Sequence, residues 1–158
     1  MNRLLARLAP LALAAVTGAA LAADPKPGAQ AAPAPSDAPY QEGTVWNLTF
    51  VRTVAGMGDD YLKSLSTTWR RTMDEAKKQG VVVSYKILSM PATRPDDWDL
   101  LLMVEYRSWA ALDGLDAKLR AIEARIIGGQ DQMRTLMTKR LEIRQILGEK
   151  TGQELILK

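Results

Sequence analysis

Alternating apolar and polar positions predict three β-strands in the middle of the chain. Residues 45–53, 81–90 and 98–107 are rich in β-branched, aromatic and aliphatic side chains, which favour strands. The second and third of these segments are separated only by residues 91–97, which include two prolines. So short a link joins antiparallel neighbours, so these two strands are predicted to form a hairpin.

A helical pattern lies between the first and second predicted strands. Asp59 or Asp60 can cap its start, and a lysine-rich turn before Gly80 ends it; acids then lie at the positive end of the helix dipole and lysines at its negative end. Its apolar stripe has near-fourfold spacing and consists of Tyr61, Leu65, Trp69, Met73 and Ala76. The pattern predicts a helix that packs this stripe against the sheet.

The C-terminal part of the chain predicts more helix and a last strand. Ser108 can cap a helix that ends at Gly128, and residues 130–141 show a further helical pattern. Residues 153–158 are predicted as a final strand. The secondary structure of 141–152 stays open, because its first half fits helix and strand periodicity equally well.

The element order is therefore β-α-β-β-α(α)-β, an α+β arrangement with an antiparallel sheet that is typical of the ferredoxin-like split βαβ fold. Within it, Trp98–Tyr106 followed by Arg107–Leu112 resembles the third strand and second-helix opening of the dimeric α/β-barrel superfamily. That group includes the antibiotic-biosynthesis-monooxygenase-like domains, and the resemblance spans about residues 43–158. It implies a homodimer whose two sheets face each other across a barrel, with the helices outside.

The two faces of the predicted sheet differ in polarity. We expect the helices to cover the more apolar face, made of Trp46, Leu48, Phe50, Val81, Val83, Tyr85, Ile87, Trp98, Leu100, Leu102 and Val104. The other face is mixed and holds Asn47, Thr49, Val51, Val82, Ser84, Lys86, Leu88, Asp99, Leu101, Met103 and Glu105. A partner sheet would cover the large apolar side chains of this mixed face, so we expect dimerisation through it.

Three polar residues of the mixed face are candidate ligand-binding residues: Asn47, Lys86 and Glu105. A carboxylate beside an ammonium group can bind a polar ligand or shift the pKa of either group. Lys86 and Glu105 can equally form a structural ion pair across neighbouring strands, which is the commoner use of such charges. The family resemblance implies that Asn47 orients a ligand carbonyl, as polar residues of this strand do in the oxygenases, although it can also satisfy a backbone group. No catalytic residue is assigned.

Asp96, Asp97 and Asp99 supply carboxylates within four residues. They lack the glycine and the distant glutamate of an EF-hand loop. We therefore interpret them as a solvated turn that ends in a strand-start aspartate, and we expect no metal site.

The N-terminus has the three parts of a secretory signal peptide. Arg3 and Arg7 form a positive start before an apolar run from Leu8 to Val16, and Ala20-Leu21-Ala22 provides a cleavage site of small residues. We expect a signal peptide at residues 1–22 and a proline- and alanine-rich disordered tether at 23–42, followed by the folded domain at 43–158. The mature protein is predicted to be secreted, to the periplasm or the extracellular medium, and not to be held in a membrane after cleavage.

Composition narrows the chemistry further. The chain has 21 Lys and Arg against 18 Asp and Glu, and removing Arg3 and Arg7 leaves 19 − 18 = +1, which gives no reason to expect nucleic-acid binding. Cysteine and histidine are absent. Thiol chemistry, disulfides, Cys/His zinc sites, His-ligated haem and imidazole bases are therefore excluded. The haem-degrading and His-dependent cyclase activities of the family cannot be carried over, and no cofactor is expected.

Two functions remain open. The first is an exported homodimeric α/β-barrel domain of unassigned activity that binds a small apolar molecule or provides an assembly surface. The alternative is a cofactor-independent oxygenase or isomerase that acts on an aromatic small molecule. The sequence does not decide whether the protein is an enzyme.

Overall fold

The structure is a computed structural model that describes residues 37–94 and 96–158. The predicted signal peptide and all but the end of the predicted tether lie outside the described residues. In chain order the elements are β1 (Tyr40–Thr53), α1 (Gly58–Ser64), the π-helix η1 (Leu65–Trp69), α2 (Arg70–Lys78), β2 (Ser84–Ser89), β3 (Leu100–Tyr106), the 3-10 helix η2 (Trp109–Leu112), α3 (Leu115–Ile126), α4 (Gln130–Ile143) and β4 (Arg144–Leu157).

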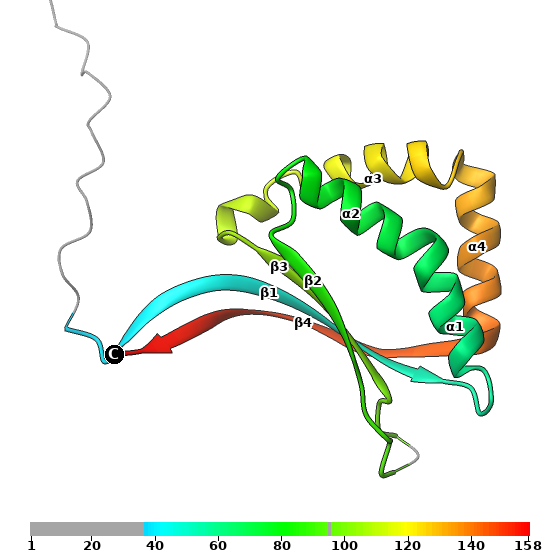
Figure 1. Ribbon diagram of the computed structural model, residues 1–158, viewed down its shortest axis with the longest axis horizontal. Helices are drawn as coiled ribbons and strands as arrows, with labels where there is room; N and C mark the ends of the chain where they lie inside the picture. The colour runs from blue at the N-terminus through cyan, green and yellow to red at the C-terminus, as the bar shows by residue number, and fades with distance from the viewer. Residues whose placement is uncertain (1–36, 95) are drawn as a thin grey trace, which may run out of the picture. The chain divides into compact units, whose positions relative to one another are not determined.

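The four strands form one sheet in the order β2-β3-β1-β4, and every neighbouring pair is antiparallel. This order of a β-α-β-β-α-β chain confirms the predicted α+β, ferredoxin-like fold. Within one chain the sheet is open: β2 and β4 are its edges, and it does not close into a barrel. The helices lie together on one side of it (Figure 1). No helix of the described segments is both long and apolar enough to cross a bilayer.

The core lies between the helices and the sheet and has two parts. One cluster of buried side chains joins the start of β1 to α2 and α3, and consists of Val45, Met73, Ala76, Val82, Val104, Tyr106 and Ile122. The other joins the end of β1 to α1 and η1, and consists of Val51, Tyr61, Leu65, Leu100 and Leu102. Trp69 packs against both clusters. The predicted stripe of the first helix therefore supplies most of the helical side of the core, and Ile122 of α3 adds to it.

The observed strands depart from the predicted bounds at the edges of the sheet. β1 begins at Tyr40 instead of residue 45, and β2 begins at Ser84 instead of residue 81. The last strand was expected only from residue 153, but β4 starts at Arg144. Because β4 is an edge strand with mostly exposed side chains, it has no buried face to leave an alternating pattern in the sequence.

The predicted helices are present with two differences. The first helix continues through α1, η1 and α2 but widens to a π-helix at Leu65–Trp69. The segment after Ser108 is only a 3-10 turn, and α3 begins after Gly114, whose φ of 65° is the left-handed conformation that glycine adopts most easily. α4 then extends the second helical pattern to Ile143.

The prediction of which face of the first strand lies under the helices is wrong. Val45 and Val51, both 0% exposed, are the residues of β1 that reach the core. Asn47 lies opposite Val104, so it also belongs to the helix-facing side. Trp46, Leu48 and Phe50 lie opposite Glu105, Met103 and Leu101 on the other side. The prediction gave the more apolar set to the helices, but the helices require apolar contacts only near the two ends of this segment.

Candidate functional site

The side of the sheet that faces away from the helices is more apolar than predicted. We call it the open face and define it by strand register as Trp46, Leu48, Phe50, Ser84, Lys86, Leu88, Leu101, Met103, Glu105 and Lys150. Side chains opposite one another in neighbouring strands share a face. The aromatic and aliphatic members come from β1, β2 and β3. The open face therefore combines a broad apolar surface with a few charged groups.

Lys86 and Glu105 both lie on the open face, as predicted, but they do not form the ion pair expected between them. The register places Lys86 opposite Met103 and Glu105 opposite Ser84. The ammonium group of Lys86 lies 4.7 Å from the ring centroid of Trp46, a cation–π contact. The Glu105 carboxylate accepts a hydrogen bond from the Ser84 hydroxyl. Each charged group thus has a neutral partner and can still bind a ligand of opposite charge.

Asn47 is separated from this pair by the sheet itself. Its side-chain amide donates a hydrogen bond of 3.1 Å to the Thr151 hydroxyl on β4. The prediction that Asn47 shares a face with Lys86 and Glu105 is wrong, for the reason given for β1. Asn47 was the one residue matched to the oxygenases through the family resemblance, so the open face has no counterpart to it. Ligand binding by any of the three residues stays a prediction.

Two glycines of β4 leave free space beside the aromatic residues of the open face. Gly148 lies opposite Phe50, and Gly152 lies opposite Trp46. A Cβ atom added at either glycine would meet no atom within 4 Å. Glycine within a strand often marks a place where a ligand or another chain approaches closely. The indole and phenyl rings therefore border a strip of the sheet that carries no side chain at these two positions.

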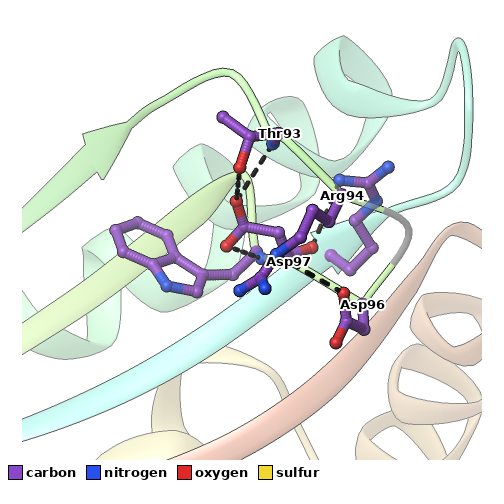
Figure 2. Close-up of polar contacts among 6 residues, drawn as sticks. Thr93, Arg94, Asp96 and Asp97 are labelled. Atoms are coloured by element: carbon purple, nitrogen blue, oxygen red, sulfur yellow. Dashed lines mark hydrogen bonds and ion pairs between the residues drawn. The ribbon is translucent and has the colours of Figure 1, made fainter.

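The aspartates before β3 are used within the loop. Asp97 accepts hydrogen bonds from the Thr93 backbone amide and hydroxyl, each 3.0 Å long, and Arg94 lies 4.0 Å from Asp96 (Figure 2). The Thr93 amide and hydroxyl lower the pKa of Asp97. Asp99 accepts three hydrogen bonds from the backbone and side chain of Thr53. The interpretation as a turn with a strand-start aspartate is confirmed. Within the described residues, no group of three or more acids could hold a metal ion.

A buried arginine cluster was missed in the sequence. Arg140 on α4 is only 7% exposed. Its Nε donates to the Ser64 hydroxyl (3.1 Å), and its Nη2 donates to the Ser64 carbonyl (3.4 Å) and the Thr68 hydroxyl. These hydrogen bonds lie at the start of the π-helix η1. Single π-helical turns within α-helices occur frequently at functional sites. In the sequence, Arg140 shares helical spacing with the apolar residues Met133, Leu136 and Met137, and a charged residue on such a stripe was the available signal.

A second arginine continues this cluster. Arg144 lies over the ring of Tyr61 at 5.8 Å, and its Nε is buried without a hydrogen-bond partner. Burial raises the pKa of Tyr61, while the two arginines oppose that change. Burial also lowers the pKa of Arg140. No carboxylate within the described segments forms an ion pair with Arg140 or Arg144, so the cluster is a buried, net positive region.

A hollow of about 490 Å³ lies among η1, α2, α3 and α4, on the helix side of the sheet. Its lining includes the charged side chains of Arg71, Asp131 and Lys139 and the apolar side chains of Ile126, Ile127 and Leu136. None of the three predicted ligand-binding residues lines it. The open face and this hollow are therefore two separate surfaces.

Comparisons with known proteins do not identify a family for this chain. No protein-family model matches the sequence, and no curated protein matches it. Among solved structures, HapK from Hahella chejuensis is similar with a TM-score of 0.46 and 12% identity, over 70% of this chain and 91% of that one. Protein SO0527 from Shewanella oneidensis has a TM-score of 0.45 and 9% identity, over 74% and 96%. A dimeric ferredoxin-like protein from an uncultured marine organism has a TM-score of 0.46 and 13% identity, over 75% and 98%.

Proposed function

We propose that this chain is an exported homodimer in which two copies pack their open faces together around a space that binds a small apolar molecule. The observation that carries the proposal is the open face itself. Within the described segments no helix covers it, yet Trp46, Leu48 and Phe50 stand on it together with Leu88 and Met103. Contiguous apolar patches of this kind on soluble proteins mark interaction sites. Export rests on the predicted signal peptide.

The distribution of charge on the open face suits a two-fold interface. Lys86 lies on the edge strand β2 and Lys150 on the opposite edge strand β4, while Glu105 lies near the end of β3. The apolar side chains lie between these groups. An apolar centre with a polar rim is the usual anatomy of a protein interface. In a two-fold dimer the same patch meets its own copy, so charges of both signs on one patch can pair across the two-fold axis.

The place for a ligand is the glycine strip of β4. Gly148 and Gly152 leave room beside the rings of Phe50 and Trp46, and a second sheet would close this room from above. Aromatic and aliphatic walls select an apolar molecule. Lys86, already in contact with Trp46, can add a charge-assisted contact to a polar group at one end of that molecule.

Met103→Lys tests the dimer. Met103 is half-buried in the single chain, so a lysine there should be tolerated by the monomer but would place an unpaired charge in the interface, costing several kcal/mol if the interface is dry. Sedimentation velocity should show a dimer for the wild type and a monomer for the variant. Leu101 is a poorer choice, because it is only 8% exposed without a partner. Leu141→Lys on α4, at a position 69% exposed, is the matched control. A wild-type monomer at micromolar concentration would end the proposal.

Gly152→Leu tests the ligand space. Because no atom lies near an added Cβ, the fold should accept leucine, and the side chain should fill the room beside Trp46. We expect the fluorescence enhancement of 1-anilinonaphthalene-8-sulfonate by the wild-type dimer to be lost in the variant, and any molecule that co-purifies in native mass spectrometry to be lost with it. Gly58→Ala at the start of α1, where an added Cβ meets only the Thr53 hydroxyl at 3.8 Å, is the control for general effects of a side chain at glycine. Unchanged probe binding by a folded Gly152→Leu dimer would reject this location.

A further inference from the structure

The hollow on the helix side of the sheet lies beside one long helix that contacts two others. The continuous helix of α1, η1 and α2 contacts α4 through α1 and α3 through α2, and Figure 1 shows α3 and α4 meeting at a corner beside it. Residues of η1, the start of α2, the end of α3 and α4 line the hollow. Its volume of about 490 Å³ is within the range of about 300–1,000 Å³ that small-molecule pockets occupy.

Two cationic side chains line the hollow without an anionic partner. Arg71 of α2 and Lys139 of α4 are exposed, and neither forms an ion pair within the described segments. Asp131 also lines the hollow, but it pairs with neither cation. It precedes Lys139 by eight positions, which is about 12 Å along a helix. The fold therefore brings two unpaired positive charges to one hollow.

The buried arginine cluster adds positive charge behind one wall of the hollow. Thr68 lines the hollow, and its hydroxyl accepts a hydrogen bond from Nη2 of Arg140 while it donates to the Ser64 carbonyl. Arg140 is 7% exposed and forms no ion pair with an acid of the described residues. A charge surrounded by protein is screened less than one in water. The guanidinium therefore makes the hollow more favourable for an anion.

The lining also has an apolar part and a free hydroxyl. Ile126, Ile127 and Leu136 are half-buried at the hollow. The Thr135 hydroxyl, which lines it from α4, makes no hydrogen bond among the residues that the structure describes. Polar groups that fix orientation beside apolar walls are the usual composition of a small-molecule site. Here the orienting groups are cations and a hydroxyl, and the walls are aliphatic.

We propose that the hollow binds a small carboxylate that carries an aliphatic chain. The fork of the Arg71 guanidinium and the Lys139 ammonium group bind the carboxylate through charge-assisted hydrogen bonds, and the chain lies against the three aliphatic side chains. The formal charge of the lining is 2 − 1 = +1, which a singly charged anion neutralises. The site is formed by a single chain, so the inference does not depend on the proposed dimer.

Octanoate is the probe, and isothermal titration calorimetry measures its binding. The wild type should bind one octanoate per chain. Arg71→Met/Lys139→Met removes both charges at exposed positions, where the fold should accept the change, and should weaken binding by about tenfold or more. Thr135→Trp fills the hollow without changing the charge and should abolish binding. Far-UV circular dichroism checks that each variant is folded.

Matched controls separate the hollow from general charge and from the open face. Lys77→Met/Lys118→Met removes the same charge from exposed lysines of α2 and α3 that do not line the hollow, and it should bind octanoate like the wild type. Gly152→Leu, on the open face, should do the same. Octylammonium tests the sign of the charge and inorganic phosphate tests the aliphatic part, and each should bind the wild type at least about tenfold more weakly than octanoate does.

The outcomes decide between the hollow and the open face. Octanoate binding that is lost in both hollow variants and kept in both controls supports the inference. If a folded hollow variant of either kind binds octanoate like the wild type, or if binding is lost only in Gly152→Leu, the hollow is not the site and the inference is wrong. A wild type that does not bind octanoate, or that binds octylammonium or phosphate equally well, overturns the assignment of an aliphatic carboxylate.

Discussion

The buried guanidinium of Arg140 should be worth more to the fold as a hydrogen-bonding group than as a charge. It donates to Ser64 and Thr68 and has no carboxylate partner within ion-pair distance in the described segments. Arg140→Ala removes these bonds and leaves an unfilled space, which should lower the free energy of unfolding by about 2–4 kcal/mol. Arg140→Met keeps most of the volume and removes the cost of burying a charge, so its effect should be only about 0–1 kcal/mol.

Urea unfolding followed by far-UV circular dichroism measures both changes. Thr68→Ala and the double variant with Arg140→Ala complete a double-mutant cycle. Because the two side chains are in contact, the cycle should show a coupling of about 0.5–3 kcal/mol. If Arg140→Met is as destabilising as Arg140→Ala, the charge itself contributes and our argument from desolvation fails. A coupling of zero would show that the Thr68 hydrogen bond contributes nothing to stability.

Three further predictions use other parts of the chain. Burial raises the pKa of Glu123 against the opposing effect of Arg120 and Arg140, so ionisation of this carboxyl destabilises the folded state as pH rises through its folded pKa. Glu123→Gln should therefore raise the melting temperature at pH 7 and leave it unchanged at a pH below the pKa of the carboxyl in the unfolded chain. Equal gains at both pH values would contradict this. Gly114→Ala places a Cβ at a φ of 65° without a steric contact, so it should cost about 1 kcal/mol through backbone strain alone in urea unfolding, and a stabilised variant would rule the strain out. N-terminal sequencing of the native protein should start within a residue or two of Ala23, whereas an intact Met1 on soluble cytoplasmic protein would remove the export proposal.

The fold was predictable because its helices and inner strands bury one face each. An element that buries one face has apolar residues at regular intervals in its sequence. The stripe of Tyr61, Leu65 and Met73, which are all buried, is an example. The sequence of β4 lacks this pattern, because its side chains are mostly exposed and it pairs with a neighbouring strand on one side only. Strand existence and order were therefore easier to predict than the start of the last strand.

The candidate site was only partly predictable, for a different reason. Both faces of β1 carry apolar residues, so polarity alone could not say which face meets the helices, and the choice made for Asn47 was wrong. Lys86 and Glu105 share a face because β2 and β3 form the predicted hairpin. Their actual partners, Trp46 and Ser84, depend on side-chain directions and on a register that the sequence pattern does not contain. The arginine cluster requires knowing that α4 packs beside α1, a contact between segments distant in the chain.

The π-helix η1 has a consequence for insertions and deletions in this chain. Residues four apart on a regular α-helix advance by about 40° around its axis, so the spacing from residue 61 to 73 would drift by about 120° and leave the core. The wider turn at Leu65–Trp69 takes up this drift, which keeps Tyr61 and Met73 buried in their separate clusters. Deleting one residue from η1 would leave eleven residue steps between Tyr61 and Met73, about 1100° or about 20° beyond three turns of a regular α-helix, so the segment would become regular helix and keep both side chains on the core. Deleting one residue from α2 before Met73 would instead leave the π-helix in place and turn the rest of α2 by about 100°, which would carry Met73 and Ala76 away from the sheet.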